Sequence, residues 1–301
     1  LFLPLLVKEG YSKSFSLGLV TAAGSLGLLF PPSLPLILYA LTAGISVKSV
    51  FIAGLLPGLI RVGIVSGWAV WQGRNHSISR HRFNLNKAIQ AFKEAKWEMI
   101  IPFFILFGIF GGFTTLVETA ALTVIYVILI EVIVYKDLRW KDLVKISNEC
   151  GTLIGGVLII LGVAMGLTSF LVDAQVPLQL LDWVKSNISS KFVFLIMLNI
   201  FLLAIGCMMD IFSAIIISVP LITPIGAYFG IDPLHLAIIF IANLELGFLT
   251  PPVGMNLFLS AYRFKEDMPT IYKSTVPFFI AMLISVIAVT YLPILSTWAT
   301  N

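Results

Sequence analysis

Two apolar stretches of about 25 to 30 residues are each interrupted near their centre by the same motif, Gly-x-x-x-Pro-Pro. The motif occupies residues 27–32 and again residues 247–252. Two successive prolines remove two backbone donors and disfavour the helical conformation of the preceding residue, so a helix cannot continue through the motif. Half of such a stretch is too short to cross hydrocarbon, which takes about 20 residues. We therefore predict a re-entrant helical hairpin over about residues 14–44 and another over about residues 232–262.

The composition identifies the surroundings of these hairpins as a lipid bilayer. The chain of 301 residues is 59% hydrophobic and 11% charged, with a mean hydropathy of +1.03. A soluble domain carries roughly 25% charged residues, because its surface faces water. We therefore predict an all-α polytopic membrane protein. Five further apolar segments are Val50–Trp71, Ile100–Tyr135 with a break at 111–115, Gly151–Val172, Phe192–Phe229 and Val276–Leu295.

The two motifs belong to an internal repeat. A shift of 220 positions aligns residues 3–60 with residues 223–280 without a gap, and ten positions are identical. Six of the ten are Gly or Pro, whereas 23 Gly and 15 Pro in 301 residues predict fewer than one such match by chance. The counterparts of residues 192–222 would precede Leu1, so we expect the chain to be the later part of a longer protein whose first repeat is truncated here.

The repeat divides the chain into four predicted parts. Residues 1–71 form the end of the first repeat, with its hairpin and the span that follows. Residues 72–99 form a basic amphipathic loop, and residues 100–172 form connecting transmembrane segments. Residues 192–299 form the second repeat, with its hairpin and a final span.

The basic loop sets the orientation in the membrane. It carries six basic and two acidic residues, which accounts for the whole net charge of +4. The positive-inside rule therefore places it in the cytoplasm. Residues 85–98 are predicted to lie as an amphipathic helix at the membrane surface. Nucleic-acid binding is the alternative explanation of a basic run, but one loop between apolar spans supports it weakly. The basic residues are Arg74, Arg80, Arg82, Lys87, Lys93 and Lys96.

Enzymatic functions find little support in the sequence. Cys150 and Cys207 lie in or beside apolar segments, so we interpret both as buried thiols and expect no disulfide framework. His76, His81 and His235 lack the spacing of a zinc site. No phosphate-binding Gly-x-x-x-x-Gly-Lys-Ser/Thr loop is present, and no nucleophile is paired with a base. We therefore predict neither an enzyme nor a cofactor.

The polar residues at the two motifs are predicted to bind a cation and a substrate. Paired broken helices in corresponding positions of two repeats indicate the binding site of a secondary transporter. The side chains are few and mostly uncharged, which suits a monovalent hard cation such as Na⁺. The candidates are Gly24, Ser25, Gly27, Pro31, Pro32 and Ser33 at the first motif, and Asn243, Glu245, Thr250, Pro251, Pro252, Val253, Gly254 and Asn256 at the second.

Ionisable residues within apolar segments are further candidates, because a membrane charge must be paired, hydrated or neutralised. Asp210 and Glu118 are predicted intramembrane carboxylates with a function. Glu245 is interpreted either as an ion ligand or as a brace of the hairpin. Arg61 either contacts a substrate carboxylate, pairs internally or extends to the interface.

Residues 24–33, 206–220 and 243–256 resemble the large membrane subunit, of the DctM type, of tripartite ATP-independent periplasmic (TRAP) transporters. The resemblance covers essentially the whole chain. It implies an elevator-type transporter with two inverted repeats and two hairpins, which imports an organic acid with Na⁺ as the coupling ion. The implied partners are a small four-helix membrane subunit and a periplasmic substrate-binding protein, and the implied location is the bacterial inner membrane. The ion and substrate sites would lie at the two motifs.

One departure from the family pattern lies at Thr115-Leu116-Val117-Glu118-Thr119, where the family usually has Thr-Pro-Thr-Glu-Ala. The proline is lost although Glu118 is kept. Three alternative functions stay open on the sequence: a single-component Na⁺-coupled carboxylate transporter, a passive channel, and a membrane scaffold subunit that does not transport. Dicarboxylates, sugar acids, ectoine-like solutes and amino acids are all compatible substrates.

Overall fold

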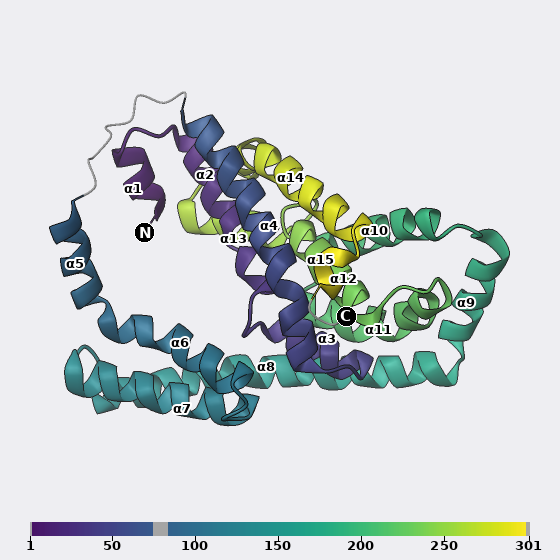
Figure 1. Ribbon diagram of the computed structural model, residues 1–301, viewed down its shortest axis with the longest axis horizontal. Coiled ribbons are helices and arrows are strands. Elements are labelled where there is room, and N and C mark those ends of the chain that lie inside the picture. Colours follow the sequence, from purple (N-terminus) through teal and green to yellow (C-terminus); the bar gives the residue numbers. More distant parts are fainter. Residues whose placement is uncertain (1, 75–83, 299–301) are drawn as a thin grey trace. The chain divides into compact units, whose positions relative to one another are not determined.

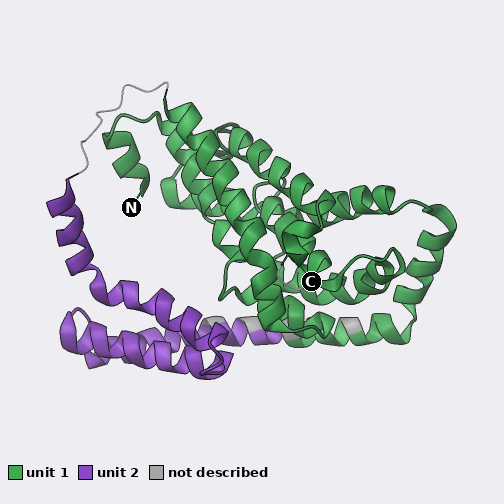
Figure 2. Cartoon of the chain, viewed as in Figure 1, with its two compact units in different colours: residues 1–79, 161–301 green, residues 80–160 purple. Residues whose placement is uncertain are grey.

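The computed structural model describes residues 2–74 and 84–298, apart from the side chains of six residues in the helix that spans 140–173. The described backbone is helical and contains no strand. It divides into two compact units, residues 1–79 with 161–301 and residues 80–160 (Figure 2). Among the sequence predictions, those for His76, Arg80, His81 and Arg82 lie outside the described residues.

Unit 1 contains most of the helices and both Gly-x-x-x-Pro-Pro motifs (Figure 1). Its elements are α1 (Phe2–Lys8), α2 (Lys13–Ala23), the 3₁₀ helix η1 (Leu26–Leu29), α3 (Leu34–Ala43), α4 (Val47–Gly73), α9 (Val176–Asn187), α10 (Lys191–Met208), α11 (Ile211–Tyr228), α12 (Pro233–Gly247), α13 (Met255–Phe264), α14 (Met268–Tyr291) and α15 (Ile294–Thr297). The C-terminal part of α8 (Trp140–Asp173) also belongs to it.

Unit 2 contains the basic amphipathic segment and a helical pair. Its elements are α5 (Leu85–Glu94), α6 (Lys96–Phe110), α7 (Leu116–Leu129), the π-helix η2 (Ile130–Val134) and the first part of α8. The predicted break at residues 111–115 is confirmed, because α6 ends at Phe110 and α7 begins at Leu116. The prediction of a buried thiol at Cys150 was wrong: this residue is exposed on α8, whereas Cys207 is buried.

Five helices within the described residues are long and apolar enough to cross a membrane. This number supports the prediction of a multi-pass membrane protein. The five are α4, α7 with η2, α10, α11 and α14. The broken pair formed by α2 with η1 and by α3 passes the same test as one bent span.

The Pro-Pro motifs break their helices, but the chain does not reverse at them as we predicted. The first pair bends by 42° between Leu29 and Leu34, which is far from the reversal that a hairpin requires. In the second pair α13 packs against α2 and α14 instead of returning along α12. Proline forbids helix continuation without specifying the new direction of the chain. Each motif is therefore a break in a helix that runs on, and the prediction of hairpins over 14–44 and 232–262 is corrected.

The two broken helices lie antiparallel, because α2 contacts α13 while α3 and η1 contact α12. The Thr21 hydroxyl donates to Ser260 Oγ across the first crossing at 2.9 Å, and the rings of Tyr39 and Phe240 meet edge to face across the second at 5.3 Å. The helices repeat with the same shift of 220 positions as the sequence. Under this shift α2 and α3 correspond to α12 and α13, and α4 corresponds to α14.

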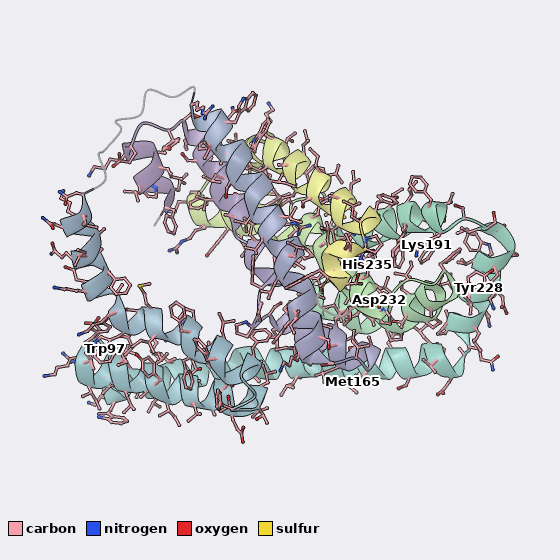
Figure 3. All side chains as sticks on the ribbon, in the orientation of Figure 1. Trp97, Met165, Lys191, Tyr228, Asp232 and His235 are labelled. Atoms are coloured by element: carbon pink, nitrogen blue, oxygen red, sulfur yellow. The ribbon has the colours of Figure 1, made fainter. Side chains whose placement is uncertain are left out.

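A helical hairpin does exist in unit 1, and it consists of α10 and α11. Their outer ends meet, since Lys191 Nζ donates to the Gly230 carbonyl at 3.2 Å and the rings of Phe194 and Phe229 stack at 4.7 Å. Lys191 on α10 and Tyr228 on α11 mark these ends in Figure 3. The tip of the hairpin is at Met209 and Asp210, between the two helices.

The hairpin tip packs against the break that follows α12. Every residue from His235 to Gly247 is buried, because α12 is enclosed by α4, α10, α11 and α14. A methyl carbon added to Gly247 would lie 2.6 Å from Cα of Gly206, so the two backbones touch where both residues are glycine. The Gly254 N–H donates to the Cys207 carbonyl at 3.2 Å. The end of α10 is thereby fixed to the second break.

This contact predicts that Gly247→Ala destabilises the protein by about 1–3 kcal/mol, the usual cost of overpacking, because the new methyl group meets backbone that no rotamer change can move. Gly63→Ala is the matched control, since a methyl group there has no atom within 4 Å and replaces a helical glycine. Thermal unfolding in detergent measures both variants. Equal melting temperatures for the two would contradict the close backbone contact.

Candidate functional site

The second break, residues 248–254, brings a helix start without a side-chain cap to the hairpin tip. Gly254 adopts a positive φ of 49° and precedes α13, and it has no side chain with which to cap the helix. Uncapped N–H groups and the helix dipole favour an anion at such a position. Asn256, in the first turn of α13, donates its backbone N–H to the Phe248 carbonyl at 3.2 Å and so closes the break.

The side chain of Asn256 connects the second motif to the first. Its Nδ2 donates to the Thr21 carbonyl at 3.3 Å and lies 3.6 Å from the position that a Cβ on Gly24 would occupy. Gly24 follows α2 directly, at the start of the first break. The structure therefore brings together predicted residues of both motifs, Gly24 and Asn256, which are distant in sequence.

The first break contains a short 3₁₀ helix and a helix cap. Ser33 caps α3, because its Oγ accepts from the Leu36 N–H at 3.4 Å. The Leu29 carbonyl packs against α4, where a methyl group on Gly54 would lie 2.5 Å from its oxygen. A methyl group on Gly27 has no atom within 4 Å. The first break is thus braced by α4 on one side and open at Gly27.

Arg61 and Glu245 form a buried ion pair beside the second break. Arg61 is 1% exposed and Glu245 is fully buried, and Arg61 Nη1 donates to Glu245 Oε2. Arg61 also donates from Nε to Ser285 Oγ at 2.9 Å and from Nη2 to the Ala242 carbonyl at 3.2 Å. All three guanidinium nitrogens are thereby engaged, so Arg61 links α4, α12 and α14. Of the predicted alternatives for Arg61, the structure supports internal pairing.

Two buried oxygen atoms at the breaks have no hydrogen-bond partner among the described residues. They are Ser25 Oγ and Glu245 Oε1. The two residues lie 220 positions apart, at the same place in each repeat. Buried polar atoms are nearly always hydrogen-bonded, and the exceptions require an explanation. Oxygen atoms without a donor are the ligands that a hard cation takes.

A polar network lies on the other side of α12. Asn243 Nδ2 donates to Asn199 Oδ1 at 2.6 Å and to the Ile239 carbonyl at 2.8 Å. The Thr290 hydroxyl donates to the same Asn199 oxygen at 3.1 Å. Asn243 therefore fixes α12 to α10 and α14. The sequence analysis missed Asn199 and Ser285, although an asparagine alone in an apolar span is a signal that could have identified Asn199.

The predicted carboxylates Asp210 and Glu118 both act as helix caps. At the hairpin tip, Asp210 accepts from the Ser213 N–H and from the Ser213 hydroxyl, each at 2.8 Å. In unit 2, Glu118 is exposed and forms a capping box with Thr115, at 2.8 Å and 3.3 Å. The structure brings Asp210 to the hairpin tip, whereas Glu118 belongs to the other unit.

The remaining residues of the second motif line the break without strong contacts. The Thr250 hydroxyl donates to the Leu246 carbonyl at 3.1 Å. Pro251, Pro252 and Val253 are exposed. Within the described residues no three His, Cys, Asp or Glu side chains form a cluster that could hold a metal ion. The oxygen atoms at the breaks are mainly hydroxyl, amide and carbonyl groups.

Removing one partner of a buried ion pair destabilises a protein far more than replacing both partners with apolar residues, because the remaining charge is left buried and unpaired. We therefore predict that Arg61→Met and Glu245→Leu each destabilise the protein by about 3–5 kcal/mol, and that the double variant recovers most of this loss. Thermal unfolding of the four proteins in detergent measures the coupling. A double variant whose loss equals the sum of the two single losses would show that the two residues are independent.

Comparisons with known proteins identify the family of this chain. Residues 1–295 match the family model of the tripartite ATP-independent periplasmic transporter, DctM component. The chain is 33% identical to the C4-dicarboxylate TRAP transporter large permease protein DctM of Pseudomonas aeruginosa, over 97% of this chain and 68% of that protein.

Two other relatives carry different substrate names. The chain is 32% identical to the isethionate TRAP transporter permease protein DctMQ of Oleidesulfovibrio alaskensis, over 97% of this chain and 46% of that protein. It is 29% identical to the ectoine/5-hydroxyectoine TRAP transporter large permease protein UehC of Ruegeria pomeroyi, over 96% and 68%. The chain therefore belongs to the DctM family of TRAP transporter large permeases, which are multi-pass membrane transport proteins and not enzymes.

Proposed function

We propose that this permease imports a small organic acid across the bacterial inner membrane, with Na⁺ as the coupling ion. The observation that carries the proposal is a pair of buried oxygens, Ser25 Oγ and Glu245 Oε1, which lie at equivalent places in two broken helices and have no hydrogen-bond partner in the described part of the chain. Broken helices supply carbonyl oxygens for a cation and helix N-termini for an anion. The uncapped start of α13 at Gly254 suits a carboxylate.

We propose that a periplasmic binding protein delivers the acid and that a small four-helix membrane subunit assembles with the permease. Membership of the tripartite family supports both partners. The DctMQ relative supports the second, because the region matched to this chain is only 46% of that protein. The relatives are named for C4-dicarboxylate, isethionate and ectoine, so their names support a small organic solute as the class and no single compound.

An elevator motion is part of this proposal. Unit 1 contains both breaks, the hairpin tip and the Arg61–Glu245 pair, and all of them adjoin the buried helix α12. Interlocked elements move as one body, since a packed interior resists deformation. In the proposed cycle this body carries the bound acid and Na⁺ from one side of the membrane to the other.

Uptake into proteoliposomes tests the coupling. The full-length permease with its small subunit and binding protein is assayed with labelled dicarboxylates, sugar acids, ectoine-like solutes and amino acids. We expect uptake of one class that requires both an inward Na⁺ gradient and the binding protein. Uptake without Na⁺ would refute the coupling, and uptake without the binding protein would favour a channel or a single-component carrier.

Substitution of two serines in the first motif distinguishes a loss of ion binding from a loss of stability. Ser25 Oγ has no hydrogen-bond partner among the residues that the structure describes, so Ser25→Ala removes none of the bonds seen there, whereas Ser33→Ala removes the cap of α3. We predict that Ser25→Ala keeps the melting temperature and raises the Na⁺ concentration for half-maximal uptake by about tenfold, a loss of 1.4 kcal/mol. Ser33→Ala is expected to lose about 1 kcal/mol of stability. Wild-type Na⁺ dependence in Ser25→Ala would exclude its hydroxyl as a ligand.

A further inference from the structure

His235 is a buried ionisable residue that the proposed transport site does not use. It lies in the first turn of α12 and is 2% exposed. Its Nε2 lies 3.2 Å from the Thr290 carbonyl at the end of α14, and its Nδ1 lies 3.1 Å from Ser296 Oγ of α15. The imidazole therefore joins three helices of unit 1 at the start of α12, where Figure 3 labels it.

The two contacts assign the tautomer of the neutral ring. A carbonyl oxygen can only accept, so Nε2 carries the hydrogen and donates to Thr290, and Nδ1 accepts from the Ser296 hydroxyl. Ser296 is fully buried. The Pro293 carbonyl, one turn before Ser296, already accepts from the Ser296 N–H, the Thr297 N–H and the Thr297 hydroxyl. The neutral ring thus supplies the acceptor for a buried hydroxyl group.

Protonation of the ring would remove this acceptor and add a charge. Both nitrogens of an imidazolium donate, so Ser296 Oγ would have to accept and its own hydrogen would lose its partner. The new charge would be buried, which is costly without an ion pair. It would also lie in the first turn of α12, where the helix dipole disfavours a cation. These three effects favour the neutral ring as long as α15 stays in place.

The charged side chains nearest the ring act in opposite directions. Asp232, the N-cap of α12, attracts an imidazolium, but its carboxylate already accepts from two N–H groups of the first turn, at 2.8 and 3.1 Å. Lys191 of α10 repels an imidazolium. Lys48 lies in the first turn of α4, which packs against both α12 and α15. At the end of α14, the ring of Tyr291 packs against Phe192 of α10. The ring thus meets one engaged carboxylate beside two lysines.

This end of unit 1 lies opposite the basic loop. A Cβ on Gly54 of α4 would lie 3.6 Å from Ile238 of α12, and Arg61, seven residues later, donates to the Ala242 carbonyl. The two helices therefore run parallel. Because α4 leads into the loop that the positive-inside rule places in the cytoplasm, the start of α12 lies on the other side of the membrane. His235 is then on the side whose pH follows the medium.

We propose that His235 is a pH-sensitive latch at the outer end of unit 1. The neutral ring holds α15 against α12 and α14, and protonation in an acidic medium releases α15. Release exposes the ring to water, where it binds a proton more readily, so the attached state loses stability as the pH falls below about 6.5, the value of an ordinary histidine. The latch connects to the polar network beside α12, because the Thr290 hydroxyl donates to Asn199 Oδ1 at 3.1 Å.

Hydrogen–deuterium exchange of the full-length permease in detergent measures the latch directly. Amides of α15 and the residues before it, within 292–298, are hydrogen-bonded to the Ala288, Leu292 and Pro293 carbonyls. We expect their protection, corrected for the intrinsic effect of pH on exchange, to fall about tenfold from about pH 7.5 to about pH 5. Residues 238–244 of α12 should stay protected. Unchanged protection of 292–298 in the wild type would overturn the proposal, as would a parallel loss at 238–244.

Histidine variants distinguish a latch from a contact that serves only the structure. The amide of His235→Gln can donate to Thr290 and accept from Ser296, but it does not titrate. We expect its protection of residues 292–298 to be the same at both pH values, whatever its level. His76→Gln with His81→Gln removes the other two histidines of this chain and should leave the acid response intact.

Two outcomes with these variants would assign the acid response to another group and refute the latch. One is a response that survives in His235→Gln, and the other is a response that disappears in His76→Gln with His81→Gln. The measurement requires neither transport nor Na⁺, so its outcome is independent of the proposed function.

Discussion

A helix that stops inside an apolar environment must find partners for its freed backbone groups within the protein. This permease contains two such helices, and each break depends on another element for that purpose. The second break is held by the carbonyl of Cys207 at the hairpin tip, which accepts the Gly254 N–H. Asn256 connects the breaks, with its side chain on the Thr21 carbonyl and its backbone on Phe248. The antiparallel crossing of the broken helices follows from this mutual dependence.

The hairpin tip can approach so closely because glycine stands on both sides of the contact. Gly206 and Gly247 bring the backbones of α10 and α12 together at the level where α12 ends. Behind this contact, the Arg61–Glu245 pair and the Asn199–Asn243 bond tie α12 to the helices around it. These contacts hold the second break in place on the side of α10 and α12. At its other end the break leads into the uncapped start of α13.

The sequence was sufficient to locate the breaks but insufficient to orient the chain after them. Proline pairs stop a helix wherever they occur, so the sequence alone was sufficient to predict helix breaks at residues 31–32 and 251–252. Whether the chain bends or reverses depends on packing between distant segments, which no local pattern encodes. The true hairpin has its tip at Asp210, which the sequence marked only as an unusual carboxylate. The partners of Arg61 were equally inaccessible, because Glu245 and Ser285 lie 184 and 224 residues away.

The two repeats differ chemically at the place where their breaks correspond. Glu245 in the second repeat corresponds to Ser25 in the first, and Arg61 corresponds to Ala281. The carboxylate is neutralised by the guanidinium, and Ser25 carries no charge, so neither break has a net charge of its own. An acid anion entering such a site finds the partial positive charge at the start of α13 but no unpaired full positive charge at the breaks, so a cation bound nearby would add to its Coulomb energy. Under the proposed function, this neutrality makes binding of the acid and of Na⁺ mutually dependent, which is the reciprocal coupling that symport requires.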